Sequence, residues 1–172
     1  MVLVHERDVQ YGVAIITVSS SRFEKHGPLK GKERIPEDDE SGREILKAFS
    51  EKVVDYYLVP DSVMEIRSAV FDALRKADVC ILTGGTGLNP KDLTIEALKD
   101  LFEKEIEGFG EIFRMQSFKE IGYSAILSRA TAGIINGKVV FCLPGSKRAV
   151  ILGLEIIKAS LKHILSHAKG LA

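Results

Sequence analysis

A glycine-rich turn follows a short apolar stretch near the middle of the chain. The stretch, residues 79–82, predicts a buried strand, and directly after it come Thr83, Gly84, Gly85, Thr86 and Gly87. Glycines at a strand end let backbone N–H groups approach a ligand closely and form a concavity that binds anions. No Lys-Ser or Lys-Thr follows at the spacing of a Walker loop, and the three-glycine dinucleotide fingerprint is missing. The turn therefore indicates an anion-binding site that is neither of these, with a plain tight turn as the alternative.

Two aspartates stand beside predicted helix starts that do not need them. Asp61 precedes a capping box that begins at Ser62, and Asp92 lies two residues before Thr94, the predicted N-cap of the next helix. Each aspartate could simply favour a helix N-terminus through the helix dipole. Two spare carboxylates at neighbouring strand ends are better explained together, because such oxygens hold Mg²⁺ on a polyphosphate or orient a reacting group.

Hydroxyl and basic side chains mark two further turns. The first predicted strand runs into Ser19, Ser20, Ser21 and Arg22, which offer hydroxyls and a fork of donors. A later turn consists of Pro144, Gly145 and Ser146 and opens a helix whose first residues are cations. Cations oppose the dipole at that helix end, so they indicate an anion nearby. The serines could equally cap a turn, and the cations could be solvated surface charge.

The elements that must position these turns alternate along the chain. Apolar and β-branched stretches predict strands at residues 11–19, 53–59 and 79–82. Near the end of the chain, Asn136-Gly137 separates residues 132–135 from 139–143 and favours a hairpin. Capping boxes and a periodicity of 3.6 residues predict helices that begin near Ser41, Ser62, Thr94, Glu105 and Ser146.

This order predicts an α/β fold with a mostly parallel sheet, helices on both faces and one antiparallel piece near the end. In such sheets the ligand crevice lies beyond the carboxyl ends of the strands. The turns described above are therefore expected to meet there. Residues 20–39 are polar and contain glycine and proline, so they predict a long loop that serves function or is mobile.

Composition limits the class of protein. The 172 residues suit one domain, residues 1–172, with residues 1–10 as an N-terminal arm, and 45% hydrophobic with 28% charged residues is typical of a soluble globular chain. Lys and Arg total 24 against 24 Asp and Glu, which gives no reason to expect nucleic acid or an anionic membrane as partner. No signal peptide or spanning stretch is visible. Cys80 and Cys142 lie in apolar runs and predict buried thiols, which favours the cytoplasm.

Two other patterns are interpreted as structural. His163 and His167 have the spacing of metal ligands, but no third ligand is visible, so they are expected to be surface residues. Phe109, Phe113 and Phe118 are expected in the core or in subunit contacts.

Taken together, the motifs resemble the MoaB/Mog family of molybdenum cofactor biosynthesis proteins. The best match is Leu82 to Gly87 with Asp92-Leu93-Thr94 and Glu96-Ala97. Further matches occur in the family's order over residues 11–165, at Val59-Pro60-Asp61, Gly108-Phe109-Gly110-Glu111, Arg114, Leu127-Ser128-Arg129-Ala130 and Leu143-Pro144-Gly145-Ser146.

The resemblance implies a three-layer α/β/α sandwich that assembles into a homotrimer or a homohexamer. It implies Mg-ATP-dependent adenylylation of molybdopterin with release of pyrophosphate, and other proteins of that pathway as possible partners. Asp61 and Asp92 would be the catalytic acids, with Mg²⁺ near them. The glycine turn, Ser128 and the turn at residues 144–146 would surround the pterin and the phosphates.

The same resemblance leaves two alternatives to an active adenylyltransferase. The Mog branch commonly has an acidic residue where this chain has Ser21, and the serine-rich version resembles the MoaB branch, some of whose members are thought to be inactive. A catalytically silent pterin-binding or scaffold protein is therefore the second interpretation, although Asp61 and Asp92 favour an enzyme. A relative of the pterin-binding domain of competence-damage-type proteins is a third, but those chains are usually longer.

Overall fold

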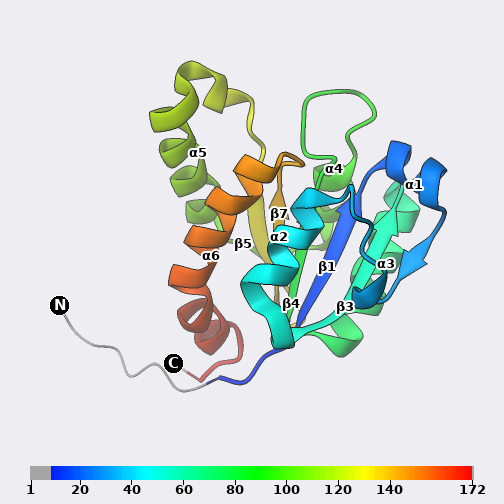
Figure 1. The fold of residues 1–172 in the computed structure, drawn as a ribbon. Helices are drawn as coiled ribbons and strands as arrows, with labels where there is room; N and C mark the ends of the chain where they lie inside the picture. Colours follow the sequence, from blue (N-terminus) through cyan, green and yellow to red (C-terminus); the bar gives the residue numbers. More distant parts are fainter. Residues whose placement is uncertain (1–8, 172) are drawn as a thin grey trace.

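The computed structural model describes residues 9–171 and contains a seven-stranded sheet in the order β2-β3-β1-β4-β7-β6-β5 (Figure 1). The four strands at its centre are parallel, namely β3 (Val53–Val59), β1 (Val13–Val18), β4 (Val79–Thr83) and β7 (Lys138–Leu143). Antiparallel pairing adds β2 (Leu29–Lys30) at one edge and β6 (Thr131–Ile135) with β5 (Lys104–Glu105) at the other. The mostly parallel sheet and the hairpin at Asn136-Gly137 are confirmed.

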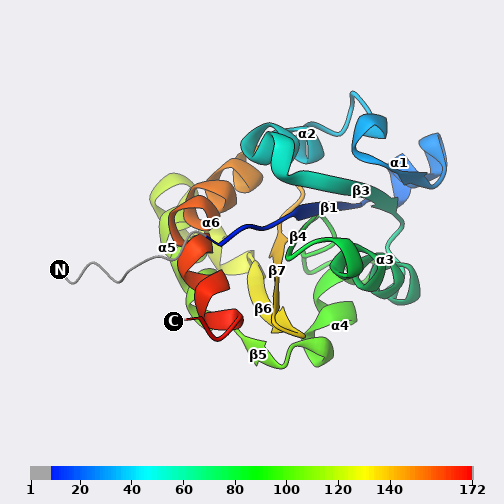
Figure 2. The same cartoon turned by 90° about the horizontal axis from the view of Figure 1, so that it is seen from below.

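Helices cover both faces of the sheet and make three layers, which Figure 2 shows from below. One face carries α2 (Glu40–Phe49), α5 (Glu107–Ile121) and α6 (Lys147–Ala168), and the other carries α3 (Val63–Lys76) and α4 (Thr94–Leu98). A seven-residue helix, α1 (Ser20–His26), follows β1. Short 3₁₀ helices are η1 (Lys32–Arg34), η2 (Ser50–Lys52), η3 (Lys99–Leu101) and η4 (Gly122–Leu127).

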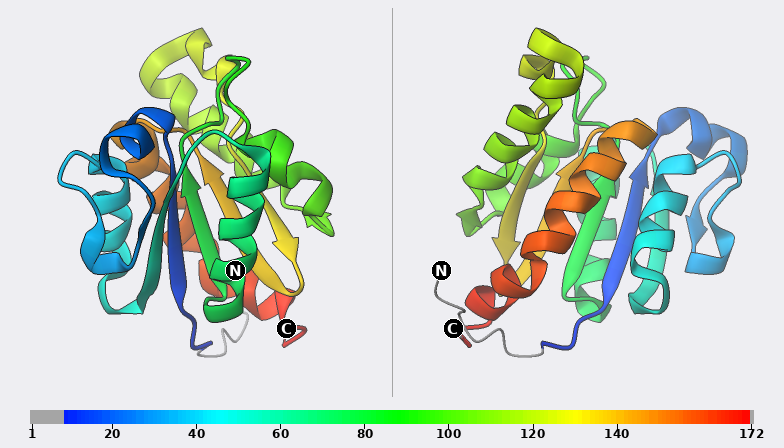
Figure 3. Two further views of the ribbon diagram at one scale, coloured as in Figure 1. Left: turned by 90° about the vertical axis from the view of Figure 1, so that its right-hand side faces the viewer. Right: turned by 60° about the vertical axis from the view of Figure 1, so that its left-hand side comes forward.

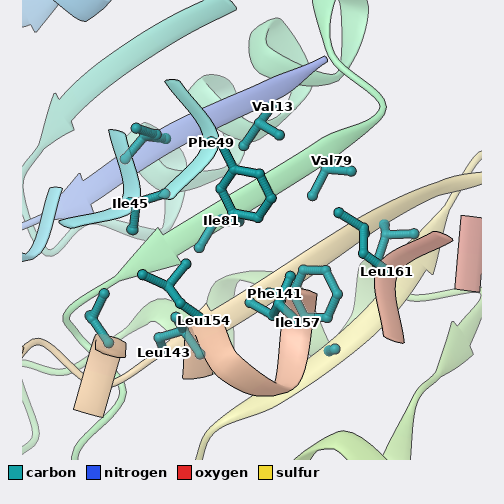
Figure 4. Close-up of a cluster of buried hydrophobic side chains, with 14 of the residues drawn as sticks. Val13, Ile45, Phe49, Val79, Ile81, Phe141, Leu143, Leu154, Ile157 and Leu161 are labelled. Carbon is teal, nitrogen blue, oxygen red and sulfur yellow. The ribbon is translucent and has the colours of Figure 1, made fainter. Parts of the chain in front are cut away.

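Each central strand is buried on both faces, which is the reason for its continuous apolar sequence. Ile81 of β4 and Phe141 of β7 pack against Phe49 of α2 and Ile157 of α6 in the cluster drawn in Figure 4. The alternate residues of the same strands pack under α3 and α4. Cys80 and Cys142 are among these buried residues, and burial raises the pKa of both thiols because the thiolate would be desolvated.

Residues 20–39 are not the long loop that their composition predicts. They form α1, η1 and the edge strand β2, which pairs with β3. The Ser19 Oγ accepts a hydrogen bond from the Arg22 backbone N–H at 3.3 Å and caps α1. Non-local pairing therefore orders a segment whose local sequence favours turns.

Helix α2 also begins differently from the prediction, because Asp39 and not Ser41 is its N-cap. The Asp39 carboxylate is fully buried and accepts hydrogen bonds from Thr17 Oγ1 at 2.6 Å, Tyr56 Oη at 2.8 Å and the Gly42 backbone N–H at 2.9 Å. Burial and this carboxylate together raise the pKa of Tyr56. Asp39 thus joins β1, β3 and α2.

Three further predictions concern the N-terminal arm, membrane-spanning helices and the number of domains. Residues 1–8 of the predicted N-terminal arm lie outside the described residues, and Val9 packs against the core. No helix within residues 9–171 combines the length and the apolar character needed to cross a membrane. That residues 1–172 form one domain stays a prediction.

A second buried carboxylate predicts how stability depends on pH. Asp55 accepts hydrogen bonds from Lys76 Nζ at 2.7 Å, Tyr57 Oη at 2.9 Å and the Tyr56 backbone N–H at 3.0 Å. Burial alone would raise the pKa of Asp55, but these hydrogen bonds outweigh it and lower the pKa below its ordinary value. A lowered pKa in the folded state gives stability that is present above the unfolded pKa of about 4 and lost as the pH falls through the folded pKa.

We expect Asp55→Asn to lower the free energy of unfolding by about 1–2 kcal/mol at pH 7, because hydrogen bonds to a buried charge are lost. The difference from the wild type should shrink as the pH falls below about 4. Urea unfolding at a series of pH values measures both effects. The control is Asp100→Asn, which removes an exposed carboxylate without a partner within residues 9–171. A difference that stayed constant down to the lowest pH would contradict the assignment.

Candidate functional site

The predicted turns meet at one rim of the sheet. Strands β1, β4 and β7 are parallel neighbours, so the segments after their carboxyl ends lie side by side. In Figures 1 and 3 the green loop after β4 rises above the sheet near the start of α6. The Gly84 backbone N–H donates to the Leu143 carbonyl oxygen at 3.0 Å and joins the glycine turn to the segment after β7.

The glycine turn needs glycine because its backbone is left-handed and closely packed. Gly84 and Gly85 have φ angles of +94° and +67°, a region that side chains disfavour. A Cβ at Gly84 would overlap the Val18 carbonyl oxygen of β1, and a Cβ at Gly85 would overlap Thr94 Oγ1. The turn can therefore lie against the end of β1 only without side chains at these positions.

Three hydroxyl groups hold the two turns in place. Thr83 Oγ1 donates to the Pro144 carbonyl oxygen at 3.0 Å, and Thr94 Oγ1 donates to the Gly84 carbonyl oxygen at 2.8 Å. Thr94 is the first residue of α4 and not the predicted N-cap. From α2, Ser41 Oγ donates to the Gly145 carbonyl oxygen at 2.8 Å. Sequence reasoning missed this role of Ser41, since its partner is 104 residues away.

Asp61 stands at one end of the glycine turn. Its Oδ2 accepts from Ser20 Oγ at 2.7 Å and from the Ser20 backbone N–H at 3.3 Å, and its own N–H donates to Ser20 Oγ at 3.0 Å. Its Oδ1 faces the turn, since a Cβ built on Gly85 would lie 3.0 Å from that atom. Asp61 forms no ion pair within residues 9–171, so one carboxylate oxygen remains available.

Asp92 stands at the other end of the turn. Its Oδ2 accepts from the Asn89 backbone N–H at 3.2 Å and would lie 2.6 Å from a Cβ on Gly87. Like Asp61, it is half-buried and has no ion pair in the described part of the chain. The structure thus brings Asp61, the glycine turn and Asp92 together at one rim.

A cavity of about 460 Å³ opens beside the turn. Part of its lining is apolar, from Phe113, Ile121 and Leu127. The rest contains the predicted catalytic residue Asp92 and most of the predicted substrate-binding residues, namely Gly84, Gly85, Thr86, Gly87, Ser128, Pro144, Gly145 and Ser146. The backbone N–H groups of residues 85–88 form no hydrogen bond within residues 9–171. Such a set of free donors beside an apolar wall suits a ligand that carries a phosphate on a flat apolar body.

The four residues after β1 do not act as one group. Ser20 contacts Asp61 as described, whereas Ser19 caps α1 and lies 3.4 Å from the Ser21 hydroxyl. The Arg22 guanidinium donates to the Asp38 carbonyl oxygen, with Nε at 3.1 Å and Nη2 at 2.9 Å. Substrate binding by Ser19, Ser21 and Arg22 therefore stays a prediction, and each has a structural partner.

The two cations at the start of α6 also have partners. Lys147 Nζ lies 3.8 Å from Glu40 and 3.6 Å from Glu44, and Arg148 Nε donates to Glu120 at 2.7 Å. Carboxylates of α2 and α5 therefore explain why cations are tolerated at this helix end. The two cations thus do not by themselves require a bound anion nearby.

The donor set fits a metal held jointly with phosphates. The described residues contain no group of three or more His, Cys, Asp or Glu side chains that could hold a metal ion, and His163 and His167 are exposed. Mg²⁺ usually binds through one or two carboxylates together with substrate phosphates. Asp61 and Asp92 on either side of a turn with free N–H donors match that pattern.

A larger cavity lies elsewhere. It has a volume of about 770 Å³ and is lined by residues of α1, β2, β3 and α3, including Tyr57, Phe71 and Arg75. Lys30 and Asp72 in its wall pair with each other at 2.6 Å. We assign the site to the smaller cavity because free N–H donors of the glycine turn and the unpaired carboxylate of Asp92 line it.

The fold and the rim define the class of protein: an α/β/α sandwich whose free N–H donors, at the carboxyl ends of its strands, suit a small phosphate-bearing ligand. The chain belongs to the MoaB/Mog family of molybdenum cofactor biosynthesis proteins, since the family described as "Probable molybdopterin binding domain" matches residues 14–163. The resemblance inferred from the motifs is confirmed.

Individual relatives agree with this assignment. A molybdopterin adenylyltransferase of Pyrococcus furiosus is 50% identical over 139 residues, which cover 77% of this chain and 82% of that protein. A probable molybdopterin adenylyltransferase of Methanocaldococcus jannaschii is 44% identical over 167 residues, or 96% of this chain and 98% of that protein. The crystal structure of the tungsten cofactor synthesizing protein MoaB from Pyrococcus furiosus superposes with a TM-score of 0.82 at 44% identity, covering 95% of this chain and 99% of that one.

Replacing Gly84 tests the packing of the turn. We expect Gly84→Ala to cost at least about 2 kcal/mol of stability, because it combines an unfavourable φ with an overlap on the Val18 carbonyl. The control is Gly108→Ala in α5, where a Cβ meets open space, and this variant should be as stable as the wild type or slightly more so. Urea midpoints compare the two, and equal midpoints would refute the close approach.

Proposed function

We propose that this protein is a molybdopterin adenylyltransferase. It transfers the adenylyl group of Mg-ATP to the terminal phosphate of molybdopterin and releases pyrophosphate. The observation that carries the proposal is the row of free N–H groups at residues 85–88 with an unpaired carboxylate at either end. The names of two relatives at 50% and 44% identity support it.

In the proposed reaction an oxygen of the pterin's terminal phosphate attacks the α-phosphorus of ATP. The bond from that phosphorus to the oxygen bridging to the β-phosphorus breaks, and pyrophosphate leaves with the bond's electrons. Such transfers depend mainly on positioning and on neutralising spread negative charge. The N–H groups of the glycine turn supply fixed positive dipoles for this purpose, and Phe113, Ile121 and Leu127 give the cavity an apolar wall.

Asp61 and Asp92 have separate positions in this proposal. They would hold Mg²⁺, which supplies positive charge to the triphosphate when it is bound. Ser20 fixes one oxygen of Asp61 and leaves the other toward the turn, whereas the Asn89 N–H binds Asp92 Oδ2, the same oxygen that faces Gly87. Each carboxylate is therefore oriented before the ligand arrives.

Asp92→Asn separates catalysis from binding. We expect it to bind molybdopterin within about threefold of the wild type and to lower AMP transfer on the order of 100-fold or more, since an amide oxygen lacks the charge that holds a metal. Fluorescence titration measures binding, and pyrophosphate release in the presence of molybdopterin and Mg-ATP measures turnover. Unchanged turnover would remove Asp92 from the mechanism. A wild-type protein that binds the pterin but releases no pyrophosphate would instead be the silent binding protein.

Assembly into a trimer or hexamer is also part of the proposal. An apolar surface, which we call the α5–η4 surface, consists of the exposed side chains Ile112, Met115, Phe118, Ile121, Tyr123, Ile126 and Leu127. Large apolar side chains that are exposed in this number on two packed elements indicate a protein–protein contact. We propose that copies of the chain meet there. The cytoplasmic location likewise stays a proposal, supported by the two free buried thiols.

A charge placed on the α5–η4 surface tests the assembly. Ile126 is 74% exposed, and burying a lysine in its place would leave an unpaired charge in an apolar contact. We expect Ile126→Lys to sediment as a monomer at a concentration where the wild type is oligomeric. Met64 on α3 is similarly exposed, at 75%, so Met64→Lys should leave the assembly intact. If both variants dissociate, or if neither does, the contact between copies lies on another surface.

A further inference from the structure

Arg129 joins three segments of the rim. It lies between η4 and β6, and its Nε donates to the Thr86 carbonyl oxygen at 3.0 Å while its Nη2 donates to the Gly87 carbonyl oxygen at 2.6 Å. The same guanidinium donates to both oxygens of Glu96 on α4, at 2.5 Å and 3.3 Å. The hydrogen bond from Arg129 holds the pKa of Glu96 below its ordinary value, so this carboxylate is charged at neutral pH.

These contacts occupy the side chain of Arg129. Four of the five N–H groups of a guanidinium are used, and its charge is offset by Glu96. Although Arg129 contributes to the cavity lining, it has one N–H group left for a ligand. Its contacts are therefore those of a support for the glycine turn and not those of a free cation that binds phosphate.

The two carbonyls that Arg129 binds set the direction of two N–H groups. In a planar trans peptide the C=O and the following N–H point in opposite directions. Bonds to the carbonyls of Thr86 and Gly87 thus orient the N–H groups of Gly87 and Leu88, which are two of the free donors at residues 85–88. A glycine-rich backbone would otherwise be free to turn a carbonyl oxygen toward the phosphate.

The segment that carries Arg129 is itself anchored to α5. Arg114 Nη1 approaches the carbonyl oxygens of Ser128 at 3.5 Å and Ala130 at 3.4 Å. Helix α5 comes close to this segment because Gly110 has no side chain, as a Cβ there would lie 2.6 Å from the Ala130 oxygen. A contact to α4 through Glu96 and one to α5 through Arg114 thus fix the position of Arg129.

We propose that Arg129, held by Glu96, is a positioning residue for adenylyl transfer that acts through the glycine turn. This inference rests on the proposed function. Lysine at position 129 keeps the charge but lacks the planar fork that reaches two carbonyls and a carboxylate together. Glu96→Gln keeps two polar atoms in the side chain but removes the negative charge that holds the Arg129 guanidinium in place.

Steady-state kinetics with molybdopterin and Mg-ATP measure the effect. We expect Arg129→Lys to lower kcat at least about 10-fold and to change KM for either substrate less than about threefold, because misdirected N–H groups fail mainly where charge develops in the transition state. Glu96→Gln should show a smaller loss of kcat. Arg43→Lys is the control, since Arg43 also donates to a backbone carbonyl, that of Ile35, which belongs to none of the rim turns. It should match the wild type.

Exchanging the two charges separates support of the turn from a simple ion pair. The double variant Arg129→Glu with Glu96→Arg can restore an ion pair, but a glutamate at position 129 cannot donate to the two carbonyls. We expect its kcat to stay at or below that of Arg129→Lys. Full recovery of kcat in the double variant would show that Arg129 acts only through its ion pair with Glu96. A rise in KM with unchanged kcat in Arg129→Lys would show that Arg129 binds the substrate directly. Wild-type kinetics in Arg129→Lys would also overturn the proposal.

Amide hydrogen exchange distinguishes this inference from the proposed function. It needs no turnover, so it remains informative even if the wild type releases no pyrophosphate and the proposed activity is wrong. The hydrogen-bonded amides of Gly84 and Thr94, which donate to the Leu143 and Gly85 carbonyl oxygens, should exchange at least about fivefold faster in Arg129→Lys than in the wild type or in Arg43→Lys, because the turn loses its external support. Equal exchange in all three proteins would show that Arg129 does not hold the turn.

Discussion

The close approach of three backbones determines how this rim is built. Gly84 lies against the Val18 carbonyl at the end of β1. Gly145 in turn lies against Gly84, since a Cβ on Gly145 would be 3.3 Å from the Gly84 Cα. Because no side chain separates these segments, the turns after β1, β4 and β7 can form one continuous surface. The carboxylates of Asp61 and Asp92 reach its two ends for the same reason: a Cβ on Gly85 or Gly87 would crowd them.

The free hydrogen-bond donors of the glycine turn belong to the backbone. The neighbouring cations Arg129, Lys147 and Arg148 each lie within ion-pair distance of glutamates on α2, α4 or α5. The row of N–H dipoles at residues 85–88, whose direction is set by the fold, is free to bind an anion. Fixed dipoles of this kind need no reorganisation when charge develops, whereas a flexible lysine must first be ordered. A chain with zero net charge can therefore still bind a highly charged ligand locally.

The sequence predicted the features that depend on local pattern. The parallel strands, the helices from Ser62 and Ser146 and the hairpin at Asn136-Gly137 all follow from periodicity, capping and turn chemistry. The prediction of a loop at residues 20–39 was wrong because β2 forms through pairing with β3 and not through its own propensity. The supports of the site were missed for a similar reason. Ser41 and Arg129 act on carbonyls 104 and 43 residues away, and a backbone carbonyl carries no sequence signature.

The apolar α5–η4 surface and the cavity share two residues, Ile121 and Leu127. Contact between copies at this surface would thus cover one wall of the cavity with protein in place of water. Excluding water lowers the local dielectric constant and strengthens the interaction of the N–H dipoles with a phosphate. It would also remove the water that could compete with the pterin phosphate for the α-phosphorus. On this argument, assembly and catalysis are linked through the apolar wall, since a monomer would leave the same donors facing solvent.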